Sequence, residues 1–304
     1  MTLSVGISRA GCATWNLNPT SNDWNTAANW TPATVPNGAH DTATFDVSNV
    51  TDVFVQATDI LKAMTFDPDA SPFTISIGGS VAFGSLTLGS AGIVNNSGTT
   101  QNLLIAGLST DLQSSLTFIR TATAGNGTVI TNNPYGTTIF ADSSSAGSAT
   151  FINHSEGGLG MTVFRDNSTA ANGIFTNEAG DGQFGGQISI EDDSAAGAGF
   201  FTNKGQGLLG GVILFDLNAR AGTATFINEL NSHGAGASMQ FAGNSSADHG
   251  TFTFQGGQFG NSSKATVVFL NNATADEAVI TLEATLSNQS TGAALSFLDC
   301  STAH

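Results

Sequence analysis

The chain has 304 residues, of which 37 are glycine, 21 are phenylalanine and only 10% are charged. This composition argues against a helical enzyme, which needs Glu, Lys, Arg and Leu on its helices, and favours an all-β fold rich in turns. Seven Lys and Arg residues against 23 Asp and Glu residues give a formal net charge of −16, which repels phosphate backbones and therefore excludes nucleic acid as an expected partner.

Residues 1–12 are expected to be a leader or a disordered tail. They lack the charged start and apolar core of a signal peptide. No stretch of the sequence reaches the roughly 20 apolar residues of a membrane span. Cys12 and Cys300 lie near opposite ends of the chain. In an elongated fold they are too far apart for the roughly 5.5 Å Cα separation of a disulfide. We expect two free thiols, with a link between molecules as the alternative.

All three tryptophans lie within residues 13–50, in Thr14-Trp15-Asn16, Asp23-Trp24-Asn25 and Ala28-Asn29-Trp30. Val35-Pro36-Asn37 and Asp41-Thr42-Ala43-Thr44-Phe45 follow them. We expect this segment to form a cap, because the end of a stack of strands exposes strand edges and core. An aromatic platform that binds glycans is the alternative interpretation of Trp15, Trp24 and Trp30.

Residues 13–66 resemble the opening of exported bacterial surface proteins with autotransporter-associated β-strand repeats. In those proteins, spaced Trp-Asn units precede a Val-Pro turn and a strand of the Asp-x-Ala-x-Phe kind. The resemblance implies a passenger-like β-solenoid that is extracellular or on the cell surface. Two features of the family, a carboxy-terminal translocating barrel and a sorting or anchoring helix, have no counterpart in this sequence.

Residues 51–118 are expected to form the first, irregular coils of the fold. Short β-like segments recur there, in Val53-Phe54-Val55, Met64-Thr65-Phe66, Phe73-Thr74-Ile75-Ser76-Ile77 and Ser85-Leu86-Thr87-Leu88. A helix over Asp59 to Phe66 is the weaker interpretation, because β-like sequence flanks it on both sides.

A repeat of about 25 residues runs through residues 119–295, and residues 296–304 form a tail. Aligning the copies on Phe140, Phe164, Ile190, Phe215, Phe241 and Phe269 gives successive spacings of 24, 26, 25, 26 and 28 residues. Such a period indicates stacked structural units. The sequence therefore predicts a right-handed parallel β-helix, in which equivalent residues of successive coils lie one above another.

Three sets of equivalent positions predict ladders of like side chains. The apolar core ladder comprises Phe151, Phe175, Phe201, Phe226, Phe252 and Ile280. The corner ladder comprises Ala146, Ala170, Ala196, Ala221, Ala247 and Ala275, where a site has room for one methyl group. The third ladder comprises Asn153, Asn177, Asn203 and Asn228, whose amides can hydrogen-bond along the stack. Glycine pairs between the strands predict sharp corners.

Candidate chemistry is sparse. Asp142, Asp166 and Asp192 share one repeat position and are expected to stack at one corner. Either they are ordinary turn residues or their oxygens bind Ca²⁺, the one cofactor that the sequence suggests. The histidines at 40, 154, 233, 249 and 304 lack metal-ligand spacing, and Asp248-His249 beside Ser245 and Ser246 is too common a composition to indicate a catalytic triad.

The leading functional hypothesis is therefore a non-enzymatic extracellular structural protein, acting as a surface stalk, an adhesin segment or a filament subunit that associates end to end. The first alternative is a carbohydrate-active enzyme, a polysaccharide lyase or hydrolase, that uses a groove along one β-face. The second is a glycan-binding module on a β-helix. The expected partners are further copies of the chain and a glycan or other cell-surface ligand.

Overall fold

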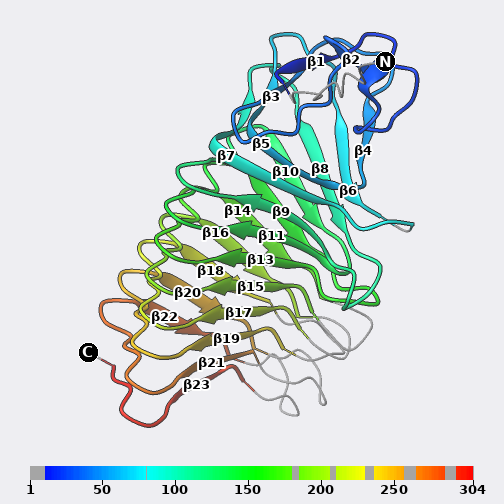
Figure 1. Cartoon of the computed structure of the whole chain (residues 1–304). Coiled ribbons are helices and arrows are strands. Elements are labelled where there is room, and N and C mark those ends of the chain that lie inside the picture. The colour runs from blue at the N-terminus through cyan, green and yellow to red at the C-terminus, as the bar shows by residue number, and fades with distance from the viewer. Residues whose placement is uncertain are drawn as a thin grey trace, which may run out of the picture.

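The fold of the protein is described here from a computed structural model. The structure describes residues 11–79, 81–179, 185–205, 210–229, 236–256, 265–284 and 292–303. Apart from a short 3-10 helix, η1 (Ala27–Asn29), the secondary structure of these residues consists of β-strands. Successive strands from β3 onwards belong alternately to two large sheets, which stack into an elongated coil with β1 near one end and β23 near the other (Figure 1).

The first sheet, sheet A, has 13 strands. They are β1 (Ala13–Trp15), β2 (Trp30–Thr31), β3 (Thr42–Phe45), β5 (Thr58–Phe66), β7 (Ser85–Asn95), β9 (Ser114–Phe118), β11 (Gly136–Phe140), β13 (Met161–Phe164), β15 (Gln187–Ile190), β17 (Val212–Phe215), β19 (Ser238–Phe241), β21 (Thr266–Phe269) and β23 (Ala294–Phe297). Its strands pair in parallel, except that β2 pairs antiparallel with β1 at the amino-terminal edge.

The second sheet, sheet B, has ten strands, all parallel to their neighbours. They are β4 (Asp52–Val55), β6 (Thr74–Gly78), β8 (Gln101–Ala106), β10 (Thr128–Asn132), β12 (Thr150–Asn153), β14 (Ile174–Asn177), β16 (Phe200–Asn203), β18 (Thr225–Asn228), β20 (Thr251–Phe254) and β22 (Val279–Leu282). Two parallel sheets joined by short turns, with one strand of each sheet in every coil, make up the expected parallel β-helix.

A narrow third face closes each coil between the two sheets. Single parallel bridges join Thr123 to Ser145, Ser145 to Thr169, and so on up the stack to Thr302. Several of these residues use a hydroxyl to accept the backbone N–H two residues later, as Ser145 does from Gly147 and Thr169 from Ala171, both at 3.0 Å. This contact stabilises a corner where the chain turns with a positive φ.

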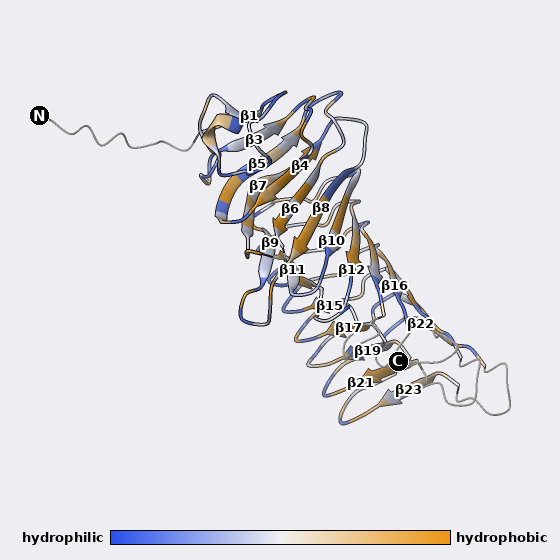
Figure 2. Ribbon diagram, turned by 90° about the vertical axis from the view of Figure 1, so that its right-hand side faces the viewer, coloured by the Kyte–Doolittle hydropathy of each residue, from blue (hydrophilic) through white to orange (hydrophobic). Residues whose placement is uncertain are grey.

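The core ladder is confirmed as a single column inside the coil. Its five phenylalanine rings stack nearly parallel, with centroid separations of 4.6 to 4.7 Å, and Phe252 pairs in register with Ile280. A second column, on sheet A, faces it: the ring of Phe140 meets the ring of Phe151 edge to face at 5.7 Å. The apolar strands that supply this core are visible in Figure 2.

The alanine ladder is buried at every rung, and its most exposed member, Ala275, is only 7% exposed. Each alanine lies one residue before a turn in which the chain has a positive φ. In three of the coils the turn residue is a glycine, Gly147, Gly197 or Gly222, with φ between 62° and 65°. Its methyl group therefore packs inside a tight turn, as the invariant small side chain predicts.

The first coils differ from the regular ones in strand length. β5 has nine residues and β7 has eleven, whereas the strands of the later coils have four or five. β5 pairs with β7 through a register shift between Leu61 and Ala63, a bulge that interrupts the ladder. The strand interpretation of Asp59 to Phe66 is confirmed, and the helix alternative is wrong.

Truncating one ring of the core ladder should cost far more stability than truncating its neighbour. Phe201 is fully buried in β16, whereas the adjacent Phe200 points outward and is 41% exposed. We expect Phe201→Ala to lower the free energy of unfolding by about 3–5 kcal/mol, and Phe200→Ala by about 1 kcal/mol or less. Urea denaturation followed by circular dichroism measures both, and equal losses would contradict the column.

Candidate functional site

The three aspartates predicted to stack do so, at the first corner after sheet A. Asp142, Asp166 and Asp192 each adopt a left-handed backbone conformation, with φ between 55° and 59°. Oδ2 of Asp166 accepts the backbone N–H of Asp142 at 2.8 Å, and Oδ2 of Asp192 accepts that of Asp166 at 3.0 Å. Aspartate is one of the few residues that tolerates this conformation, so each side chain both permits its own turn and anchors the turn of the preceding coil.

This geometry gives the aspartate column a structural role. Its carboxylates are one coil apart, and one oxygen of each of the three is already engaged by a backbone N–H. Within the described ranges, no group of three or more His, Cys, Asp and Glu side chains is arranged to hold a metal ion. Calcium binding by Asp142, Asp166 and Asp192 stays a prediction.

The predicted asparagine ladder is present and buried. Asn153 donates from Nδ2 to Oδ1 of Asn177 at 2.8 Å, and the same bond recurs from Asn177 to Asn203 and from Asn203 to Asn228, both at 3.1 Å. Each of the three donors also reaches a backbone carbonyl on the opposite sheet, as Asn177 does to Val212 at 2.9 Å. The ladder therefore fastens the end of each sheet B strand to the start of sheet A.

Two asparagine contacts lie beyond the sequence prediction. Asn132 extends the buried ladder by one coil, because it donates to Oδ1 of Asn153 at 2.8 Å. On the outside, Asn218, Asn244 and Asn272 form an exposed chain of side-chain hydrogen bonds that begins at Asp193. The sequence did carry a signal for this outer chain. In successive repeats, an Asn or Asp follows one residue after the position of the aspartate column.

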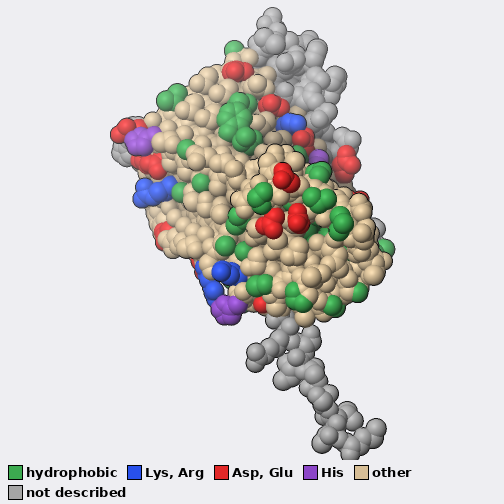
Figure 3. Space-filling view, turned by 90° about the horizontal axis from the view of Figure 1, so that it is seen from above, with side chains coloured by type: hydrophobic (Ala, Val, Ile, Leu, Met, Phe, Trp, Pro, Cys, Tyr) green, Lys and Arg blue, Asp and Glu red, His purple; other side chains and the backbone are tan. Residues whose placement is uncertain are grey.

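The three tryptophans are buried, each at most 1% exposed, and pack together at the amino-terminal end of the core. Their rings meet edge to face at 4.8 and 5.1 Å and cover the ring of Phe45. Indole N–H groups donate to backbone carbonyls, as Trp30 does to Trp24 at 2.7 Å. Because no ring lies open, these tryptophans do not form an exposed glycan platform. Seen from the cap side, the surface carries few cationic side chains (Figure 3).

A buried carboxylate lies where the cap meets the first coils. Asp59 of β5 is 1% exposed and faces Asn25 of the cap, whose Nδ2 lies 3.3 and 3.4 Å from its two carboxylate oxygens. Burial raises the pKa of Asp59 above the ordinary aspartate value, the hydrogen bond from Asn25 lowers it in part, and the negative charge of Asp23 raises it further. The combined effect on the pKa of Asp59 is upward, because burial disfavours the charged carboxylate.

The described histidines form no catalytic arrangement. His249 lies 3.3 Å from Glu277, and both side chains are exposed. The hydroxyl of Ser246 accepts the backbone N–H of Asp248 and donates to Asp276, so it serves a turn rather than a histidine. His233 and His304 lie outside the described residues. Cys12 and Cys300 are both exposed and free.

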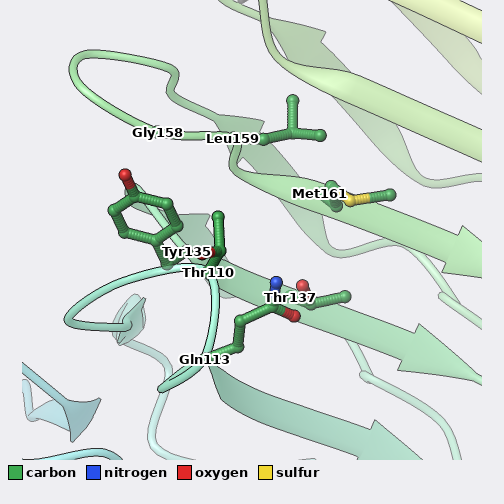
Figure 4. Close-up of a pocket in the computed structure, with 7 residues that line it drawn as sticks. All are labelled: Thr110, Gln113, Tyr135, Thr137, Gly158, Leu159 and Met161. Carbon is green, nitrogen blue, oxygen red and sulfur yellow. The ribbon is translucent and has the colours of Figure 1, made fainter.

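One small hollow is present on the outer face of sheet A, with a volume of roughly 220 Å³. Tyr135, Thr137 and Met161 line it together with the loop after β8 (Figure 4). No sequence pattern pointed to this place, because the lining residues form no ladder: the sheet position of Thr137 and Met161 carries Gln187, Val212 and Ser238 in the next coils.

Comparison with known proteins gives no relative: no family model, no curated protein and no solved structure matches this chain. Among the residues that the structure describes, none form a helix long and apolar enough to cross a membrane.

The buried asparagines should contribute more to stability than the exposed ones. Asn177→Ala leaves the amide of Asn153 without its acceptor and should lower the free energy of unfolding by about 1–3 kcal/mol. Asn172→Ala, at an exposed corner of the same coil, should change it by less than about 0.5 kcal/mol. Thermal and urea unfolding of both variants tests this, and an equally small effect would contradict the role of the ladder.

Replacing the buried acid of the cap should stabilise the protein in a pH-dependent way. A group whose folded-state pKa is raised stabilises the fold below its unfolded pKa and loses that contribution as pH rises through the folded pKa. We therefore expect Asp59→Asn to raise the melting temperature at pH 7 relative to wild type, and to change it less at pH 4. The matched exposed variant Asp52→Asn in β4 controls for the removal of one negative charge. A loss of stability at pH 7 in Asp59→Asn would contradict the prediction.

Proposed function

We propose that the protein is an extracellular structural β-solenoid that works as a rigid surface stalk, an adhesin segment or a self-assembling subunit. The observation that supports this best is the continuity of the stack: in the described coils both sheets run on strand by strand in register, the phenylalanine columns line the core, and the asparagine ladder joins the coils from Asn132 to Asn228. Such a structure supplies length and stiffness rather than a cleft.

The dimensions suit a spacer. Sheet A has 13 strands, and at about 4.8 Å between neighbouring strands it extends roughly 58 Å along the stack. Each coil contacts the next through two sheets and a bridge, so bending requires many hydrogen bonds to lengthen together. A rod of this kind holds whatever it carries at a fixed distance and angle.

An extracellular location is part of the proposal. The resemblance of residues 13–66 to exported surface proteins with autotransporter-associated repeats supports it. So does the surface chemistry, since a chain with a net charge of −16 and many Asn, Ser and Thr side chains stays soluble without binding nucleic acid.

The two ends of the described stack differ, which bears on self-association. At the amino-terminal end, buried tryptophans cover the core, and a bridge between Asp23 and Phe54 protects the edge of β4. At the other end, β22 and β23 are the outermost described strands, and their inward side chains are partly exposed, such as Leu282 at 41%. We propose that two copies associate through these carboxy-terminal rungs, because strand edges and apolar columns both gain partners there.

A charge on the carboxy-terminal rung β22 should abolish this association. We expect the 304-residue chain to form paired rods at micromolar concentration, and Leu282→Lys to leave single rods. Leu217→Lys, an equal change at a lateral corner where Leu217 is 50% exposed, should keep the pairs. Negative-stain electron microscopy with light scattering distinguishes these states. Globular or flexible particles would contradict the stalk, and single wild-type rods would contradict only the association.

A further inference from the structure

The hollow on sheet A lies where the repeat is interrupted by an extra loop. Residues 107–113, between β8 and β9, fold back on themselves through a bridge between Ser109 and Leu112. The backbone N–H of Leu108 donates to the carbonyl of Leu112 at 2.9 Å. This short structured loop forms one wall of the hollow through Thr110 and Gln113 (Figure 4).

Tyr135, the only tyrosine in the chain, is held at the hollow in an unusual backbone conformation. Its φ is 60°, which is rare for a bulky side chain and persists only where the surroundings impose it. Its N–H donates to Leu159 of the next coil at 3.0 Å, and its carbonyl accepts from Ser114 of the preceding coil at 3.1 Å. The tyrosine is therefore fixed from above and below.

The tyrosine side chain is also fixed. Its hydroxyl donates to the carbonyl of Gly157 at 2.8 Å. Its ring lies against Gly158, where an added Cβ would come within 2.6 Å of the ring. A rigid aromatic side chain in a preformed hollow loses little entropy when a ligand binds.

The lining combines apolar surface with free polar groups. Leu159 and Met161 approach the hollow from one side, and Gln113 and Thr137 from the other (Figure 4). The side chains of Thr110, Gln113 and Thr137 make no hydrogen bond to other described residues, so their donors and acceptors are available to a ligand. None of the lining residues is charged.

We propose that this hollow binds one neutral sugar unit. A sugar presents C–H faces that pack on Tyr135, Leu159 and Met161, and hydroxyls that Gln113 and the threonines can bond. The volume of roughly 220 Å³ lies below the roughly 300–1,000 Å³ of pockets for drug-sized ligands, which suits a single ring. An anionic sugar is disfavoured, because the lining offers no cation. This inference does not depend on the stalk function, since the hollow lies on the side of the stack.

Saturation-transfer difference NMR on the full chain tests the proposal. The probes are methyl glycosides of glucose, galactose, mannose and N-acetylglucosamine, with glucuronic acid as the anionic comparison. We expect ring-proton signals from at least one neutral glycoside at millimolar concentration and weaker signals from glucuronic acid. A neutral tetrasaccharide that ends in the same sugar tells two ligands apart. A site for the end of a glycan binds it at least as tightly as the monosaccharide, whereas a site for free sugar binds it more weakly.

Variants decide whether the signal comes from this hollow. Gln113→Ala and Thr137→Val each remove a polar group at the surface and should weaken binding about 2- to 10-fold, the loss expected for one hydrogen bond. Tyr135→Gly removes the ring while relieving the backbone strain, and should abolish the signal. Thr131→Val on the outer face of sheet B is the matched control and should bind as wild type does.

Three results would overturn the proposal. The first is the absence of signal from every neutral probe with folded wild-type protein. The second is binding that none of the hollow variants weakens. The third is a stronger signal from glucuronic acid than from the neutral glycosides, which would show that the hollow selects anions. A failure of the stalk function would appear instead in the particle shape, so the two hypotheses fail separately.

Discussion

Vertical registry of the parallel strands is the constraint on which the rest of the structure depends. Because each coil pairs in register with the next, as Phe151 does with Phe175 and Asn153 with Asn177, one residue choice repeated in sequence becomes one continuous column in space. The strand spacing is close to the stacking distance of aromatic rings and to the reach of one amide to the next. Phenylalanine and asparagine columns therefore follow from a single geometric condition.

The columns differ in how much variation they accept. Ile190 replaces a ring in the sheet A column without changing its register, because an apolar side chain of similar reach fills the same space. Leu217 occupies the corner position of the aspartates at a φ of 58°. The next residue in that column, Gly243, has no carboxylate, and Oδ1 of Asp216 accepts the backbone N–H of Leu217 in its place. The asparagine ladder ends at Asn228, whose amide meets the sulfur of Met239, and the next rung carries Phe254.

Most of the repeated architecture could be predicted from the sequence, because residues at equivalent positions of a repeat lie above one another in the stack. The residues of the core, alanine and asparagine ladders recur in several copies, so the sequence alone indicates their columns. The left-handed corner at Asp166 and the hydroxyl contact of Thr169 were not predictable in the same way, since they depend on φ and on hydrogen-bond direction. The edge-to-face packing of the tryptophans depends on side-chain geometry and had to be observed.

The hollow at Tyr135 could not be predicted from the sequence, because it departs from the repeat. The same departure makes it the candidate binding site. Its lining residues form no column of like side chains that a repeat would reveal. They come from three different coils, and only the fold brings them together. Two glycines in neighbouring coils accommodate the tyrosine: an added Cβ at Gly107 would lie 2.5 Å from its carbonyl oxygen, and one at Gly158 would collide with its ring. A scaffold that otherwise repeats one solution thus departs from it here with a strained tyrosine, an extra loop and free polar groups. In a repetitive stack, such a concentrated departure is where selective binding has the most physical support, because the regular coils repeat one backbone path from level to level.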